Sequence, residues 1–165
     1  MYKVERDRAK RMRWPRRLPE VPSRVWSDDE WQRLQRGYQA GAMEEKWNVF
    51  TEGRTVFCHR SWTGMGYFEV TFAPVESGGW RMVEGKVARD RLEFFKRLLS
   101  RRRRDSDAFD LVLLELVLSA IVLGEPAREL REKLDELVRR QEPDPDSIPA
   151  GYVEHIFLGS RSEEE

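Results

Sequence analysis

The sequence predicts an α+β fold in which an antiparallel sheet of about four strands packs against carboxy-terminal helices. Residues 46–84 are rich in aromatic and β-branched residues, separated by glycine-containing turns, which is typical of short antiparallel strands. Residues 107–140 repeat apolar residues every three or four positions, which is typical of helices. A chain of 165 residues, 39% of them hydrophobic, is long enough to form one domain with its own core.

The amino-terminal segment is expected to precede this domain as an arm. Residues 1–24 combine dense arginine with Pro15, Pro19 and Pro22, which interrupt the hydrogen bonding of both helices and strands. Residues 1–17 hold eight Lys or Arg against two acidic residues, so the arm is strongly basic. The predicted parts are a basic arm over 1–24, a single α+β domain over 25–158 and an acidic tail over 159–165.

The first helix of the domain is predicted to begin after Ser27. The run Ser27-Asp28-Asp29-Glu30 has the spacing of a capping box, in which the serine hydroxyl and the Glu30 carboxylate each accept a backbone N–H. We expect the helix to run to about Gln35 and to end at Gly37.

The side chains of the predicted strands that follow alternate between the two faces of the sheet. Glu52-Gly53, taken as a two-residue turn, places Lys46 opposite His59 and Glu45 opposite Arg60. Alternate residues then point to the same face. The predicted core face comprises Trp47, Val49, Val56, Cys58, Phe68, Val70 and Phe72. The opposite face comprises Lys46, Asn48, Phe57, His59, Tyr67 and Glu69.

Helical spacing of apolar residues resumes after Gly85. The predicted helices span about 87–101, 107–123 and 126–140. Glu115 interrupts the most apolar of them, so we expect this side chain to face the solvent edge or to be buried against an arginine. Tyr152–Leu158 is expected to return to the sheet as an edge strand.

Two polar elements flank the first predicted hairpin. Glu44-Glu45-Lys46-Trp47 precedes it, and His59-Arg60-Ser61-Trp62-Thr63-Gly64 follows it. The pair resembles a motif of a family of small bacterial proteins, in which a Glu/Asp-Lys-Trp element precedes a His-Arg-Ser-Trp-Thr-Gly element. The resemblance covers residues 26–72. It implies a shared fold and names no activity.

The same elements supply the candidate ligand-binding residues, which are Lys46, Arg60, Ser61, Trp62, Thr63 and Gly64. Arginine offers a bidentate fork to an anion, lysine a point charge, and glycine lets backbone N–H groups approach a phosphate. Trp62 or Tyr67 adds a face on which a base can stack. The alternative is that Glu45 and Arg60 form a cross-strand ion pair while Trp62 anchors the loop.

His59 is the candidate general acid or base, because the pKa of histidine is close to neutral. Glu69, on the neighbouring predicted strand, is the candidate carboxylate that orients it. No Ser or Cys is clearly placed as a nucleophile, and Cys58 points to the opposite face. The two histidines and the one cysteine are not separated by the intervals that are usual for metal ligands. The sequence therefore predicts neither a metal site nor a cofactor.

Basic residues are candidates for contact with nucleic-acid phosphates. Arg101–Arg104 also closes the first carboxy-terminal helix, where positive charge complements the helix dipole. The candidate contacts are Arg11, Arg13, Arg16, Arg17, Arg102 and Arg103. The alternatives are a solvated basic surface and an arm that meets the acidic carboxy-terminal residues.

The composition predicts a cytoplasmic protein without a membrane segment. Cys58 is the only cysteine, and no apolar leader follows the first Met. The apolar run Leu111–Leu123 is interrupted by Glu115 and is shorter than the roughly 20 residues that cross a bilayer.

The leading functional hypothesis is a small binding module for a phosphate-containing ligand, either a nucleotide or a nucleic acid. One alternative is an enzyme that acts on a nucleotide-like substrate through His59. Another is a subunit that binds a protein partner through the arm and exposed tryptophans. The sequence leaves the oligomeric state open.

Overall fold

The computed structural model describes residues 10–88 and 103–161 and confirms the α+β fold. In this part of the chain a six-stranded antiparallel sheet has the order β1-β6-β5-β4-β3, and β2 also pairs with β6. The sheet therefore has slightly more strands than predicted. Its strands are β1 (Pro15–Arg17), β2 (Val25–Trp26), β3 (Trp47–Glu52), β4 (Thr55–Arg60), β5 (Gly66–Pro74) and β6 (Trp80–Ala88).

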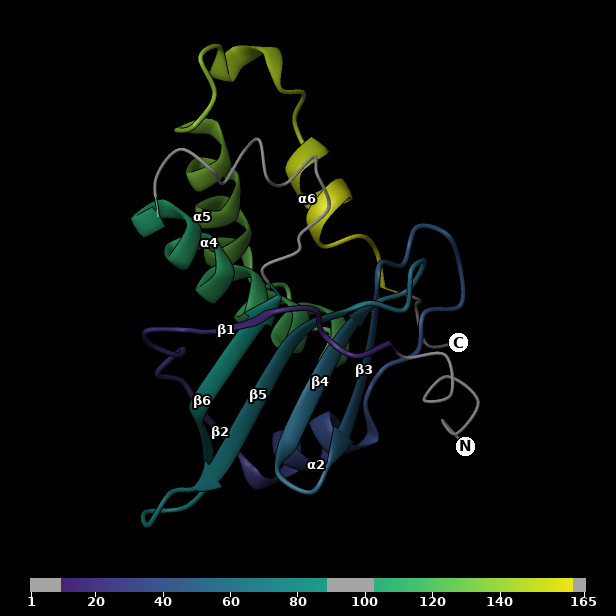
Figure 1. Cartoon of the computed structure of the whole chain (residues 1–165), viewed down its shortest axis with the longest axis vertical. Helices are drawn as coiled ribbons and strands as arrows, with labels where there is room; N and C mark the ends of the chain where they lie inside the picture. Colours follow the sequence, from purple (N-terminus) through teal and green to yellow (C-terminus); the bar gives the residue numbers. More distant parts are fainter. Residues whose placement is uncertain (1–9, 89–102, 162–165) are drawn as a thin grey trace.

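The described helices lie mostly after the sheet in sequence. They are α2 (Asp28–Arg36), α4 (Arg103–Leu116), the π-helix η1 (Val117–Val122), α5 (Arg128–Arg139), the 3₁₀ turn η2 (Pro145–Ser147) and α6 (Tyr152–Phe157). Figure 1 shows α2 behind the lower end of the sheet and α4, α5 and α6 gathered at its upper end. Helix η1 joins these two groups, because it contacts both α2 and α4.

Helix α2 forms as the sequence predicts. The Ser27 hydroxyl accepts the backbone N–H of Glu30, and the Glu30 carboxylate accepts the backbone N–H of Ser27, which completes the capping box. Gly37 ends the helix with a φ of 74°. A side chain at this glycine would meet the carbonyl oxygen of Val49 at 2.1 Å, so only glycine allows α2 to turn so close to β3.

The β3–β4 hairpin differs from the prediction by two residues of register. Glu52 pairs with Thr55, so the two-residue turn is Gly53-Arg54 instead of Glu52-Gly53. Gly53 has a φ of 60° at the first central position, as a type II′ turn requires. A shift of two residues keeps every side chain on its predicted face. The predicted core face is accordingly buried, with each of its seven side chains at most 2% exposed.

Part of the predicted arm belongs to the sheet. Strand β1 pairs with β6, and Leu18 is a core residue that is 3% exposed. Before β1, Lys10 forms a bridge with Met65 at the β4–β5 connection. The predicted boundary at residue 25 therefore falls inside the sheet, between β1 and the first residue of β2.

The carboxy-terminal elements differ from the prediction at two places. Tyr152–Phe157 forms helix α6, not the expected edge strand, and Val153 and Phe157 are the side chains that it buries. The helix predicted over about 87–101 overlaps the end of β6 at residues 87–88, and its remainder falls mainly on residues 89–102, which lie outside the described residues. None of the helices in the described ranges is long and apolar enough to cross a membrane.

The π-helix η1 ends in a group of arginine contacts. Arg33 of α2 donates to the carbonyl oxygen of Leu123 at 2.6 Å, and Arg161 donates to that of Ile121 at 2.9 Å. Carbonyl oxygens at the end of a helix lack partners within the helix, and cations there also complement its dipole. Two arginines that are distant in sequence thus donate hydrogen bonds to the carbonyl groups at the end of η1, whose residues are all buried.

Candidate functional site

The hairpin cluster predicted to bind phosphate does not form around the predicted residue pairs. Lys46 lies next to Ser61, whose backbone N–H donates to the Lys46 carbonyl at 3.0 Å. His59 pairs instead with Asn48, and Arg60 with Trp47. The Lys46 ammonium donates to the carbonyl oxygen of Met43 at 3.1 Å. The predicted pairing of Lys46 with His59 and of Glu45 with Arg60 is therefore wrong.

Arg60 is directed at the end of helix α6. Its guanidinium donates to the carbonyl oxygens of Phe157 and Ile156 at 3.0 and 3.3 Å and lies 4.8 Å from the centroid of the Trp47 ring. The indole N–H of Trp47 donates to the same Phe157 oxygen at 2.9 Å. Burial lowers the pKa of Arg60 to about 10. This arginine holds α6 against the sheet, and its donors face the chain's own carbonyl groups.

The remaining polar groups of the cluster also bond within the chain. The Ser61 hydroxyl donates to the carbonyl oxygen of Glu45 at 2.8 Å, and the Thr63 hydroxyl accepts the backbone N–H of Met65 at 3.2 Å. The Glu45 carboxylate binds the Tyr38 hydroxyl and the backbone N–H of Gly41. These bonds direct the Glu45 carboxylate to the segment before β3, whereas the Arg60 guanidinium bonds to α6. These hydrogen bonds stabilise the loops at this end of the sheet.

His59 lies on the face opposite to the core, as predicted, but it is only 6% exposed. Its Nδ1 atom is 2.9 Å from the carbonyl oxygen of Gly64, and its ring lies 5.1 Å from that of Phe50. Burial lowers its pKa, while the Gly64 carbonyl and the charge of Glu69 act in the opposite direction. No hydrogen bond joins His59 to Glu69 within residues 10–88 and 103–161. Cys58 is buried on the other face, and burial raises the pKa of its thiol.

Exposed cationic and aromatic side chains occur on residues 10–17 and on the β4–β5 turn, which Lys10 joins beside this cluster. The backbone of Lys10 donates to Gly64 at 2.8 Å and accepts from Gly66 at 3.1 Å, which holds the start of the described chain against the β4–β5 turn. Trp62 in that turn is 75% exposed, and Trp14 is 72% exposed. We call this surface the basic rim, and it consists of Lys10, Arg11, Arg13, Trp14, Arg17 and Trp62. Its four cationic residues are all exposed.

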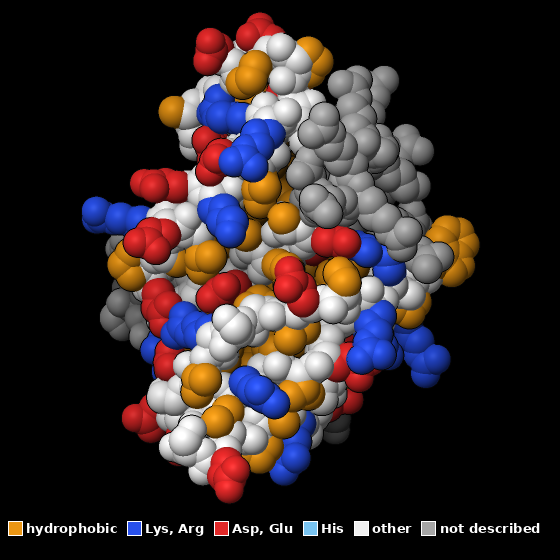
Figure 2. Space-filling view, turned by 90° about the vertical axis from the view of Figure 1, so that its left-hand side faces the viewer, with side chains coloured by type: hydrophobic (Ala, Val, Ile, Leu, Met, Phe, Trp, Pro, Cys, Tyr) orange, Lys and Arg blue, Asp and Glu red, His pale blue; other side chains and the backbone are white. Residues whose placement is uncertain are grey.

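The space-filling view shows cationic and hydrophobic side chains together at one margin of the molecule. In Figure 2 several Lys and Arg side chains gather at the right-hand margin, beside a hydrophobic side chain that stands out from the surface. Basic residues with exposed aromatic rings among them are typical of surfaces that bind single-stranded nucleic acids.

The other predicted contact residues are placed differently. Arg16 forms ion pairs with Asp107 at 2.6 Å and Asp110 at 3.3 Å, so it fastens β1 to α4. Arg102 and the side chain of Arg103 lie outside the described residues. Tyr67 is 5% exposed and packs edge-on against Trp47 with their ring centroids 5.2 Å apart. Its proposed role as a stacking face is therefore wrong.

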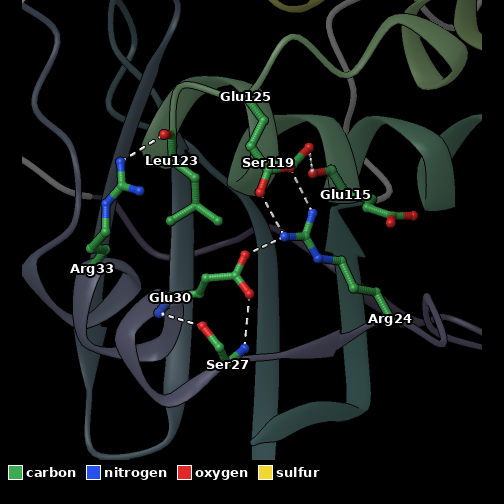
Figure 3. Close-up of polar contacts among 8 residues, drawn as sticks. All are labelled: Arg24, Ser27, Glu30, Arg33, Glu115, Ser119, Leu123 and Glu125. Carbon is green, nitrogen blue, oxygen red and sulfur yellow. Dashed lines mark hydrogen bonds and ion pairs between the residues drawn. The ribbon is translucent and has the colours of Figure 1, made fainter.

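Arg24 and two carboxylates form the second notable polar group, and Glu115 lies near it. The Arg24 guanidinium binds both oxygens of Glu125, at 2.7 and 2.8 Å, and one oxygen of Glu30. Figure 3 shows Arg24 between these two carboxylates, with the half-buried Glu115 carboxylate to the side. Burial raises the pKa of Glu115, and the charge of Arg24 partly offsets this effect. We call Arg24, Glu30 and Glu125 the Arg24 junction.

Comparisons with known proteins do not identify the protein. No family model, no curated protein and no solved structure matches the chain. The motif resemblance around Lys46 and His59 therefore gains no support from these comparisons. Within the described residues, no group of three or more His, Cys, Asp or Glu side chains is arranged to hold a metal ion.

Sequence reasoning missed Trp14 as a member of the candidate site. The signal available in the sequence was that Trp14 lies within a run of arginines, where a tryptophan is not expected to be buried. Its φ of 45° lies in the left-handed region that non-glycine residues rarely adopt. No pattern in the sequence indicates that Lys10 and Met12 lie against the β4–β5 turn.

Proposed function

We propose that the protein is a binding module for a phosphate-containing polymer, namely single-stranded nucleic acid, which it contacts through the basic rim. The observation that carries this proposal is a pair of exposed tryptophans: Trp14 lies in the same segment as the exposed rim cations, and Trp62 lies in the β4–β5 turn that the backbone of Lys10 contacts. A largely exposed indole gains little from packing within the fold, so both rings are free to contact a ligand.

The cationic side chains of the rim suit the phosphates of a single strand, and its aromatic side chains suit the bases. Arg11, Arg13 and Arg17 bring delocalised cations to the phosphates, where each contact releases condensed counterions. Trp14 and Trp62 offer faces to bases, which stack on aromatic rings with little dependence on sequence. A duplex keeps its bases stacked on one another, so the tryptophans favour a single strand.

The rim is a better candidate than the hairpin cluster that the sequence indicated. Arg60 binds two carbonyl oxygens of α6, and the Ser61 hydroxyl binds a backbone carbonyl. Binding an anion there would cost these interactions, whereas Lys10, Arg11 and Arg17 of the rim are exposed. A nucleic-acid partner is also consistent with the cytoplasmic location predicted from the sequence.

The first prediction concerns the rim cations. We expect Arg11→Ala combined with Arg17→Ala to weaken binding of a fluorescein-labelled single-stranded oligonucleotide, measured by fluorescence anisotropy at several salt concentrations. Loss of two phosphate contacts should reduce the slope of log K against log salt by about 1.4. Trp62→Ala should weaken binding by about 1–3 kcal/mol with an unchanged salt slope, because stacking releases no counterions.

The control replaces Arg36 and Arg128 with Ala, since both are exposed arginines outside the rim. An equal loss of binding in this control would show that only net charge matters. Unchanged binding in the rim variants would contradict the proposal. Tighter binding to a duplex of the same sequence would contradict the role of the tryptophans.

A further inference from the structure

A hollow of about 670 Å³ lies away from the rim residues, where α2 meets the β3–β4 turn and the start of β6. Pockets of roughly 300–1,000 Å³ are usual for small ligands. The lining residues are Asp28, Trp31, Gln32, Gln35, Gly53, Arg54 and Trp80. A Cβ atom at Gly53 would meet nothing within 4 Å, so the hollow is open on the side of the turn.

One wall of the hollow is a fixed aromatic surface. The rings of Trp80 and Trp31 stack at 4.7 Å with an interplanar angle of 20°, and Trp31 is 4% exposed. The indole N–H of Trp80 donates to the Asp28 carboxylate at 3.1 Å, which fixes the rotation of the ring. Trp80 itself is only half-buried. A ligand that contacts this wall therefore meets a surface that is already ordered, so little conformational entropy is lost.

The polar lining combines donors and acceptors with no net charge. Gln32 and Gln35 are exposed and lie one turn apart on the same side of α2. In the described part of the chain, neither amide has a hydrogen-bond partner. Arg54 supplies donors, and its guanidinium lies 5.5 Å from the centroid of the Trp80 ring. Asp28 supplies acceptors and balances this charge.

We propose that this hollow binds a neutral, polyhydroxylated ring, such as one unit of a saccharide. A hydroxyl group both donates and accepts, so it matches a lining that contains a carboxylate, two amides and a guanidinium. The carbon-bound hydrogens of such a ring form an apolar face that packs against the part of Trp80 that Trp31 and Arg54 leave exposed. A phosphate-bearing ligand fits less well, because the single cation is offset by Asp28. The site is independent of nucleic-acid binding at the rim.

The test uses ¹⁵N-labelled protein titrated with maltose and with cellobiose, followed by amide chemical shifts and tryptophan indole N–H signals. The expected result is a saturable shift of the Trp80 indole signal and of α2 amides with at least one of the two sugars. Gln32→Ala combined with Gln35→Ala should weaken this binding about tenfold, because two hydrogen bonds are lost. Gln39→Ala is the matched control, since Gln39 is also exposed but does not line the hollow.

Three results would overturn the inference. The first is the absence of a saturable shift with either sugar up to its solubility limit. The second is an equal response to sorbitol, which has the hydroxyls but no ring. The third is a tighter response of the same signals to ATP, which would show that the hollow prefers an anion. Because both glutamines are exposed, the double variant is expected to fold, and its spectrum without sugar verifies this.

Discussion

Arg60 shows how a single cationic side chain can serve the fold instead of a ligand. Its two hydrogen bonds reach carbonyl oxygens that lie 96 and 97 residues further along the chain. Trp47 donates to one of these oxygens as well, so the last turn of α6 is held by two side chains of one strand pair. Removal of the guanidinium would leave the Ile156 carbonyl without this donor and loosen α6.

We therefore predict that Arg60→Met lowers the free energy of unfolding by about 1–3 kcal/mol, because hydrogen bonds from a charged group are lost while the apolar stem is retained. Urea denaturation measures the change. Lys46→Met is the matched control and should cost less, since the Lys46 ammonium makes one exposed contact. Equal stability of Arg60→Met and the parent protein would contradict this structural role of Arg60.

At the residue scale, the sequence identified the polar residues but not their partners. The His-Arg-Ser-Trp-Thr-Gly run places Arg60 and Ser61 next to each other, yet their acceptors are carbonyl groups of α6 and of Glu45. Backbone carbonyls carry no sequence signal. The face of His59 was predictable from strand alternation, whereas its burial beside Phe50 and Gly64 depends on the tertiary structure.

Secondary-structure elements were predicted best where local geometry decides them. The capping box of α2 acts over four residues and is present as predicted. The hairpin register required a choice between two turns that both contain Gly53, and the type II′ geometry favours the one that begins with glycine. The sequence of α6 predicts a strand instead of a helix, because a short apolar run has no clear period.

The hairpin turn gives a prediction at this scale. Gly53→Ala should lower the free energy of unfolding by about 1 kcal/mol, because an L-residue is strained at a φ of 60° even where its Cβ has space. Thermal unfolding measures the change. Gly41→Ala is the control, since Gly41 is not among the glycines with positive φ. A Gly53 variant as stable as the Gly41 variant would show that the turn relaxes into another type.

At the scale of the whole molecule, side chains fasten the amino-terminal segment to helix α4 and to the loop that follows η1. Arg24 bonds to Glu125 across 101 residues, and Arg16 binds two aspartates of α4. The sequence showed a basic beginning and an acidic end but not these pairs, because the fold decides which charges meet. An arm fastened in this way presents the basic rim in a fixed position.

The Arg24 junction predicts how stability depends on pH. Burial opposes ionisation of Glu30, but hydrogen bonds from Ser27 and the charge of Arg24 outweigh it, so the pKa of Glu30 is lowered from its ordinary 4.5. The unfolded chain therefore binds a proton at a higher pH than the folded chain does. The stability that Glu30 contributes is present above pH 4.5 and is lost as the pH falls through its lowered pKa.

Replacing Glu30 with Gln should consequently lower the free energy of unfolding at neutral pH and bring the variant closer to the parent protein below pH 4.5. Urea denaturation at a series of pH values measures both effects. Glu132→Gln is the control, because Glu132 is exposed on α5, and its curve should follow that of the parent. A constant difference between Glu30→Gln and the parent at every pH would mean that the ionisation of Glu30 does not hold the amino-terminal segment and helix α2 to the end of η1.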